Sequence, residues 1–406
     1  MSSSEVLKPF ADTDDELTSG AVASIEQAYL LTDGQIALNN LESARQYSWS
    51  TFWLDPLRPT SAEYIVEQEQ LTLQFLGDPG ALDRLDELVE HLNQVDHDSP
   101  RTLLIQAQAS STAHRFAEAR RCLEQITDCA ELSASVKRLS MNVDQACGTQ
   151  LDAVLEYRQR GAAQSGRLED LVPLGALYAD LREFDRADHI YRRALNEYKG
   201  TSPLAVAWVC FQLGVLWGEL MPESRLAQAA AWYEKAVRCL PAYVKARVHL
   251  AETFIRRELI ADAKALLMPA AASGDVEVSW RLADVLTKMG RVADADKQML
   301  IARSGFEALL RKHLLAFADH GAEFYAGSGN DPQRAFELAR INVANRPTLR
   351  AFEQACERAV AAGETDQAAE LLAAAKARWG GTNAFAFSQL ADNSCQAIGA
   401  GEGNTP

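Results

Sequence analysis

Apolar residues recur along most of the chain at the spacing of an α-helix. Ala187, Tyr191, Ala194 and Leu195 follow one another at intervals of four, three and one residues. This spacing places them on one face of a helix. Comparable stretches alternate with short polar or glycine-containing segments as far as residue 382. The pattern predicts an all-α chain.

The helical pattern also repeats at a nearly constant interval. Alanines recur every 32 to 34 residues, apart from two insertions of 8 and 6 residues, at Ala119, Ala153, Ala187, Ala229, Ala263, Ala295, Ala335 and Ala368. A large residue follows most of them four positions later, such as Tyr191 or Tyr233. A bulky–small pair precedes several of them, as at Leu174-Gly175, Leu213-Gly214 and Leu250-Ala251. Each unit is therefore expected to be a hairpin of two helices that packs on the next unit.

The small residues have a mechanical role in such a hairpin. They allow two helix backbones to approach closely, while a large residue on the facing helix fills the space beside them. Gly290 and Gly363 fall between paired helices. A residue that tolerates positive φ is expected there, at the end of the first helix.

These residues resemble the tetratricopeptide repeat (TPR) family, whose pattern is W-x2-L-G-x2-Y, then A-x3-F, then P. The best matches are two units: Leu174, Gly175, Tyr178, Ala187, Tyr191 and Ala194, and then Leu213, Gly214, Trp217, Ala229, Tyr233, Ala236 and Pro241. The resemblance covers about 100–382, with a degenerate unit at 66–99. It implies a right-handed superhelical solenoid of antiparallel helix hairpins that serves as a binding scaffold.

The repeats suggest the following organisation. An acidic tail at 1–20 precedes an N-terminal helical capping segment at 21–65, and about eight or nine hairpins occupy 66–382. A C-terminal capping helix is expected at 383–398, followed by a tail at 399–406. The two insertions include Gly218–Arg225 and Gly327–Pro332. Such loops either carry contacts or are tolerated surface additions.

Composition and charge narrow the classes of partner. The chain is 48% hydrophobic and has 40 basic against 56 acidic residues, a net charge of −16. This charge repels a phosphate backbone, so we expect no nucleic-acid partner. The most apolar stretch, Leu204–Trp217, is interpreted as a core helix and not a membrane span. The start of the chain lacks the pattern of a signal peptide, and the seven scattered cysteines fit reduced thiols, so we expect a cytoplasmic protein.

No motif predicts catalysis, and no cofactor or metal site is expected. Cys122 and Cys129 are seven residues apart, as are His313 and His320. At 1.5 Å per residue, the members of each pair lie about 10 Å apart along a helix and cannot chelate one ion alone. The glycine-rich segment GSGN lacks the lysine of a phosphate-binding loop.

The resemblance places a partner groove on the concave face, along the first helix of each hairpin. Carried over position by position, the groove residues are Arg138, Asn142, Trp208, Phe211, Lys245, His249, Trp280, Arg281 and Lys288. Trp208, Phe211 and Trp280 fit either the groove or the core, because the insertion beside them shifts the register. Arg182 and Arg192 are expected to face outward.

The first hypothesis for function is a non-catalytic scaffold that holds a protein or peptide partner on its concave face. Two alternatives remain open. One is a sensor solenoid that responds to a peptide or small ligand, and the other is an accessory subunit of an enzyme complex. The sequence does not indicate the oligomeric state.

Overall fold

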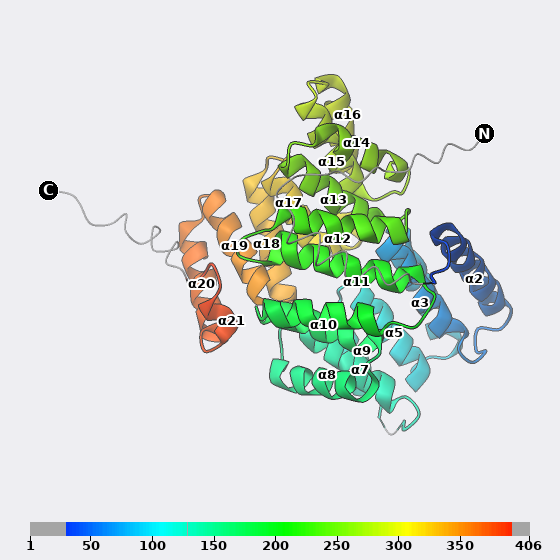
Figure 1. Cartoon of the computed structure of the whole chain (residues 1–406). Coiled ribbons are helices and arrows are strands. Elements are labelled where there is room, and N and C mark those ends of the chain that lie inside the picture. Colours follow the sequence, from blue (N-terminus) through cyan, green and yellow to red (C-terminus); the bar gives the residue numbers. More distant parts are fainter. Residues whose placement is uncertain (1–29, 128, 392–406) are drawn as a thin grey trace, which may run out of the picture.

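A computed structural model describes residues 30–127 and 129–391 of the chain, and its regular elements there are all helices (Figure 1). The predicted tails at 1–20 and 399–406 lie outside the described residues. The helices are α2 (Gly34–Leu54), α3 (Ser61–Leu76), α4 (Gly80–Val95), α5 (Pro100–Thr112), α6 (Phe116–Gln125), α7 (Ser133–Ala146), α8 (Leu151–Ser165), α9 (Leu168–Asp180), α10 (Phe184–Glu197), α11 (Pro203–Val215), η1 (Leu216–Leu220), α12 (Leu226–Cys239), α13 (Val244–Arg256), α14 (Ile260–Leu267), η2 (Met268–Ala270), α15 (Val276–Lys288), α16 (Val292–Lys312), α17 (Leu314–Ala326), α18 (Pro332–Asn345), α19 (Leu349–Ala361), α20 (Thr365–Trp379) and α21 (Asn383–Ala386).

The described helices pair into nine antiparallel hairpins, from α3/α4 to α19/α20, and each hairpin packs on the next. This arrangement confirms the predicted all-α solenoid. One apolar core runs through the hairpins from α8 to α15, and a second core fills the hairpins from α15 to α21. The helix predicted over 383–398 is a single short turn, α21, and the residues from 392 onward are outside the described range.

The glycines of the bulky–small pairs lie where two helices meet most closely. A Cβ atom on Gly175 would lie 2.7 Å from the ring of Tyr191, and one on Gly214 would lie 2.4 Å from the ring of Tyr233. Both rings are almost fully buried. The small residue on one helix and the large residue on its partner therefore fix how closely each hairpin packs.

The turn within most hairpins uses a left-handed residue. Gly290 and Gly363 have φ of 71° and 78°, as expected from the sequence, but Arg182 and Glu258 adopt φ of 61° and 60° at the same place in their hairpins. In each turn the next N–H donates to the carbonyl five residues earlier; Arg291 N, for example, donates to Leu286 O at 2.9 Å. This bond completes the helix C-terminus. Because non-glycine residues adopt this conformation here, glycine alone did not mark every turn.

The first insertion lengthens one helix of the array. α11 continues into the π-helix η1, and Arg225 N then donates to Trp217 O at 2.8 Å. Together these elements form Pro203–Leu220, the one stretch among the described residues that is long and apolar enough to cross a membrane by length and composition. Within the solenoid 56% of this stretch is buried, and Val206, Cys210 and Leu213 are fully buried.

The coil closes on itself along one edge. Early hairpins contact hairpins that lie five or six units later in the array, as α4 contacts the end of α16 and the α7/α8 turn contacts α20. We call this row of contacts the seam. It consists of Asp83, His114, Cys147, Gly148 and Arg182 on the early side and Lys312, His313, Asn345, Glu353, Arg378 and Trp379 on the late side.

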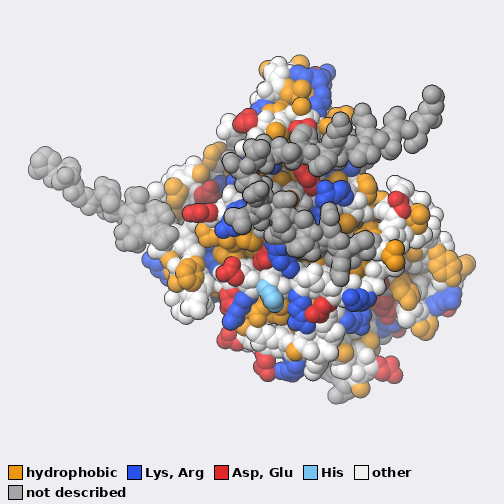
Figure 2. Space-filling view, viewed as in Figure 1, with side chains coloured by type: hydrophobic (Ala, Val, Ile, Leu, Met, Phe, Trp, Pro, Cys, Tyr) orange, Lys and Arg blue, Asp and Glu red, His pale blue; other side chains and the backbone are white. Residues whose placement is uncertain are grey.

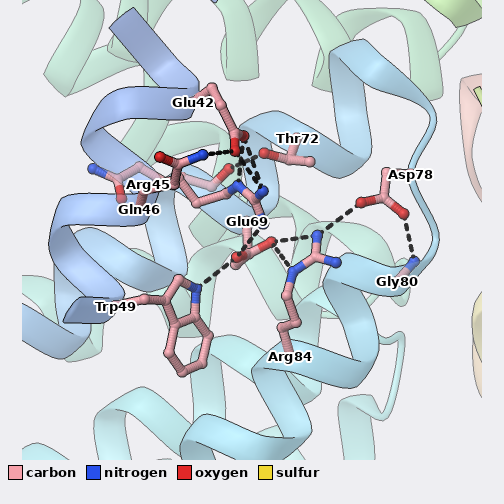
Figure 3. A network of polar contacts seen from close by, with 10 residues as sticks. Glu42, Arg45, Gln46, Trp49, Glu69, Thr72, Asp78, Gly80 and Arg84 are labelled. Carbon is pink, nitrogen blue, oxygen red and sulfur yellow. Dashed lines mark hydrogen bonds and ion pairs between the residues drawn. The ribbon is translucent and has the colours of Figure 1, made fainter. Parts of the chain in front are cut away.

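A buried carboxylate joins the N-terminal helices (Figure 3). The side chain of Glu69 on α3 is fully buried. It accepts a hydrogen bond from Trp49 Nε1 of α2 at 2.8 Å and pairs with Arg84 of α4 at 2.7 Å and Arg45 of α2 at 3.5 Å. Arg84 also pairs with Asp78 at 2.8 Å. One carboxylate therefore holds three helices in register.

Replacing Gly214 by Val should lower the free energy of unfolding by about 2 to 3 kcal/mol, because the added atoms overlap the Tyr233 ring. Gly381→Val is the control, since nothing lies within 4 Å of a Cβ atom built there. Chemical unfolding followed by circular dichroism measures both. Equal midpoints for the two variants would contradict the packing role of Gly214.

Replacing Glu69 by Ala should destabilise the N-terminal helices by about 2 to 4 kcal/mol, because it removes the buried carboxylate that the half-buried Arg45 and Arg84 share. Hydrogen exchange of α2, α3 and α4 would report this loss region by region. Glu67→Ala, at an exposed position of the same helix, is the control. If both variants exchange alike, Glu69 does not anchor these helices.

Candidate functional site: an inner charged network

Charged side chains from separate hairpins meet on the inner side of the coil. Arg350, in the first turn of α19, lies 3.7 Å from Glu219 of η1, four hairpins earlier. Further members come from the first helices of the hairpins between them. We call this set the inner charged network; it comprises Glu219, His249, Glu277, Asp319, His320, Arg346 and Arg350.

Glu219 is the centre of one half of the network. It accepts hydrogen bonds from His249 Nδ1 at 2.7 Å and from the Tyr233 hydroxyl at 2.9 Å. Burial opposes its charge, but His249 and then Arg350 lower the pKa of Glu219 to about 2. Burial likewise disfavours the imidazolium of His249, and Glu219 more than compensates, so the pKa of His249 is raised. Each member of the pair therefore favours the charged form of the other.

His320 is the centre of the other half. Its Nδ1 atom lies 2.6 Å from Glu277, and its Nε2 atom lies 3.9 Å from Asp319, which also pairs with Arg346. Burial opposes the charge on His320, but Asp319 and Glu277 raise its pKa to about 9. His320 therefore carries its proton at neutral pH, where it can donate a hydrogen bond but cannot act as a base.

The network remains open to solvent although its members come from facing helices. The side chain of Arg350 is 59% exposed and that of His320 is 33% exposed. Burial raises the pKa of the Glu323 carboxyl group, although the positive charges of His320 and Arg350 act in the opposite direction. A small cavity of about 30 Å³ adjoins the network and is lined in part by Lys245, Asp275, Glu277 and His320. The arrangement offers both signs of charge to a bound group.

The residues considered for metal binding have other partners. His313 bonds to Asp83 at 2.7 Å across the seam, and His320 belongs to the inner charged network. Cys122 is buried within the packing of α6. Within the described part of the chain, no group of three or more His, Cys, Asp or Glu residues is arranged to hold a metal ion.

Some predicted groove residues reach the network. His249 is a member, and Lys245 lines the adjoining cavity. Arg281 lies beside it: its guanidinium pairs with Glu252 at 3.1 Å and stacks 3.7 Å above the ring of Trp280.

Other predicted groove residues lie elsewhere. Phe211 and Trp280 are 7% and 4% exposed, so their rings belong to the core. Trp208 is half-buried and stacks on Phe211. The remaining three are at separate places. Arg138 is exposed on α7, Asn142 of the same helix accepts a hydrogen bond from Arg158, and Lys288 pairs with Glu258 at the end of α15.

The expectation that Arg182 faces outward is wrong, and Arg192 is held by partners on the hairpins α9/α10 and α11/α12. Arg182 is 15% exposed and pairs with Glu353 across the seam. Arg192 pairs with Asp188 at 2.6 Å and stacks on the ring of Trp232. Neither guanidinium is free on the outer surface.

Sequence reasoning missed four members of the network. Asp319, Arg346 and Arg350 lie in the most degenerate hairpins, where the repeat pattern gave no register. Glu219 lies in the first insertion, and the π-helix η1 turns its side chain inward. The insertion itself was the available signal, because π-helical segments frequently occur at functional sites.

Comparisons with known proteins identify no family for the chain. No protein-family model matches the chain, and no curated protein is similar to it in sequence. Many solved structures match the chain, and three of them illustrate the degree of similarity. One is the Cut9–Hcn1 hetero-tetramer of the APC/C, with 12% identity, 94% of this chain and 73% of that chain covered, and a TM-score of 0.43.

Two further structures have lower TM-scores against this chain. Yeast Tom70 has 12% identity and a TM-score of 0.34, with 89% of this chain and 94% of that chain covered. The C-terminal part of a TPR repeat-containing protein from Cytophaga hutchinsonii has 14% identity and a TM-score of 0.30, with 72% and 97% covered.

The protonation of His320 should make stability depend on pH. Its pKa is about 9 in the fold against 6.5 for an ordinary histidine, so the stabilisation is complete below pH 6.5 and is lost as the pH rises through about 9. We expect the unfolding free energy to fall by roughly 2 kcal/mol over this range, after allowance for solvent screening. Urea unfolding at several pH values measures it.

His320→Gln is the matched variant for this prediction. It should be less stable than the parent at pH 6 and should show a smaller decline toward pH 9, with the remainder due to His249. A variant that keeps the full decline would show that His320 is not the titrating group.

Proposed function

We propose that the chain is a non-catalytic, cytoplasmic protein-interaction scaffold that holds a segment of a partner protein against the inner charged network. The observation that carries this proposal is the position of Arg350. Its side chain is 59% exposed on the inner side of the coil, and its ion pair with Glu219 is long, at 3.7 Å. An accessible arginine with a weak partner is suited to a further charge-assisted hydrogen bond.

The chemistry of the network favours a polypeptide segment as the ligand. Arg350 and the imidazolium of His320 donate hydrogen bonds, while Glu219 and Glu252 accept them. An extended peptide presents alternating carbonyl and N–H groups along its length, which match such a mixed surface. The half-buried ring of Trp208 could add apolar contact nearby.

Other classes of partner are less consistent with the charge. The net charge of −16 opposes nucleic acid and an anionic membrane surface. On the face that Figure 2 shows, acidic and basic side chains are intermixed over the outer helices such as α10. This mixture gives no large patch of one sign there. A protein partner bound on the inner side therefore remains the best-supported proposal.

Charge reversal of Arg350 tests the proposal. Arg350→Glu should weaken partner binding by about 1 to 3 kcal/mol, because it removes a charge-assisted contact and adds repulsion. Affinity capture from the native host, with quantitative mass spectrometry of the retained proteins, identifies the partner, and titration with that partner gives the loss. Arg160→Glu on exposed α8 is the control.

The outcomes separate the hypotheses. Loss of the same retained protein in Arg350→Glu alone supports the scaffold. Equal retention by both variants would contradict binding at the inner charged network. Retention of a low-mass ligand in place of a protein would favour the sensor alternative, and co-purification of an enzymatic activity would favour the accessory subunit.

A further inference from the structure

The seam is held mainly by polar contacts. Asn345 Nδ2 donates to His114 O at 2.9 Å, and Arg378 Nη2 donates to Gly148 O at 3.0 Å. Arg182 pairs with Glu353 near one end. Near the other end, Asp83 bonds to His313 at 2.7 Å and to Lys312 at 2.5 Å.

Apolar packing at the seam occurs at two places. Where α4 and α5 meet α17, Leu82, Ala113 and Ala316 form a small separate cluster, and the ring of Trp379 lies against the turn at Gly148. Outside the seam, Phe75 of α3 belongs to the main apolar core and packs on Tyr243, with 4.7 Å between ring centroids. A polar surface with few apolar contacts separates more readily than such a core. The seam is therefore expected to part before the contacts between successive hairpins or the contact of α3 with Tyr243.

Opening the seam would not require any hairpin to unfold. Each residue of the seam lies in or beside a turn, such as Arg182, or near a helix end, such as Asn345 and Arg378. The helices keep their own backbone hydrogen bonds when these side chains part. A solenoid whose hairpins touch only their neighbours changes its pitch by small rotations summed over many units.

We propose that the seam is a gate, which separates as a unit while the hairpins stay folded and lets a partner segment enter the inner charged network from the side. The purpose assigned to the gate rests on the proposed function. With the seam open, an internal segment of a partner can enter.

Cys147 is a natural reporter of the gate. It is 2% exposed, and its Sγ atom lies 3.9 Å from Asn345 O across the seam. Burial raises the pKa of the Cys147 thiol, so the closed form reacts slowly with thiol reagents. Cys210 is fully buried inside α11, away from the seam, and burial raises the pKa of its thiol as well. It reports unfolding of the hairpins themselves.

The experiment measures the rate at which a maleimide modifies each cysteine of the full-length chain, with residue-level readout by mass spectrometry. Arg182→Glu and Glu353→Arg each place like charges across the seam. The double variant restores an opposite pair with the charges exchanged. Arg193→Glu is the control, because Arg193 pairs with Glu197 within α10 and outside the seam.

We expect each single reversal to raise the Cys147 rate by about tenfold, the factor that corresponds to one charge-assisted contact. The double variant should return close to the parent rate, and Cys210 should stay protected throughout. Higher ionic strength should also raise the Cys147 rate in the parent protein, because the ion pairs are screened.

Two results would overturn the gate. One is a Cys147 rate that is the same in both single variants as in the parent. The other is a Cys147 rate that always changes together with the Cys210 rate, which would mean that the seam parts only when hairpins unfold. Because this test uses no partner, its outcome is independent of partner capture by Arg350→Glu.

Discussion

A helix hairpin of this kind cannot bury its apolar face alone, and the rest of the structure follows from that constraint. Each hairpin covers its neighbour through small residues set against large ones, as Gly214 is set against the buried ring of Tyr233. Repetition of one packing geometry makes the chain curve. The first helices of the hairpins are thereby brought to face one another on the inner side of the coil, where their polar positions converge.

Because the first helices of the hairpins face one another on the inner side, charges from distant parts of the sequence form one network. Glu219 and Arg350 are four hairpins apart, yet their side chains meet. Bringing charged groups together in a partly enclosed space costs solvation, which opposite charges and hydrogen bonds offset. Glu219 illustrates the balance, because burial opposes its charge while His249 and Arg350 hold its pKa near 2. A surface maintained in this way is preorganised for polar contacts with a ligand.

The fold was largely predictable, since its signals are local. Ala187 and Tyr191 lie four residues apart, and that spacing alone predicts a helix with a small and a large residue on the same face. The turns were predictable where glycine marks them, as at Gly290, but not at Glu258, which adopts the same conformation without a residue-type signal. The insertion left Phe211 open between groove and core in the sequence, and its 7% exposure places it in the core.

The candidate site was predictable only in part, because its contacts are not local. His249 and Lys245 lie in a regular repeat, where the TPR resemblance gave the correct inward orientation. Closure of the coil depends on small rotations summed over five or six hairpins, and no short sequence pattern encodes that sum. The pairing of Arg182 with Glu353 is one consequence of closure. It overturned the expectation that Arg182 faces outward.

The central claim is that the functional surface is the inner side of the coil, and photo-crosslinking in the native host tests it most directly. A photoreactive amino acid placed at position 252, where the glutamate side chain is 39% exposed beside the inner charged network, should capture a partner on irradiation. The same amino acid at position 160, on exposed α8, should capture none. Crosslinks from position 160 alone would contradict the account and place the partner on the outer surface.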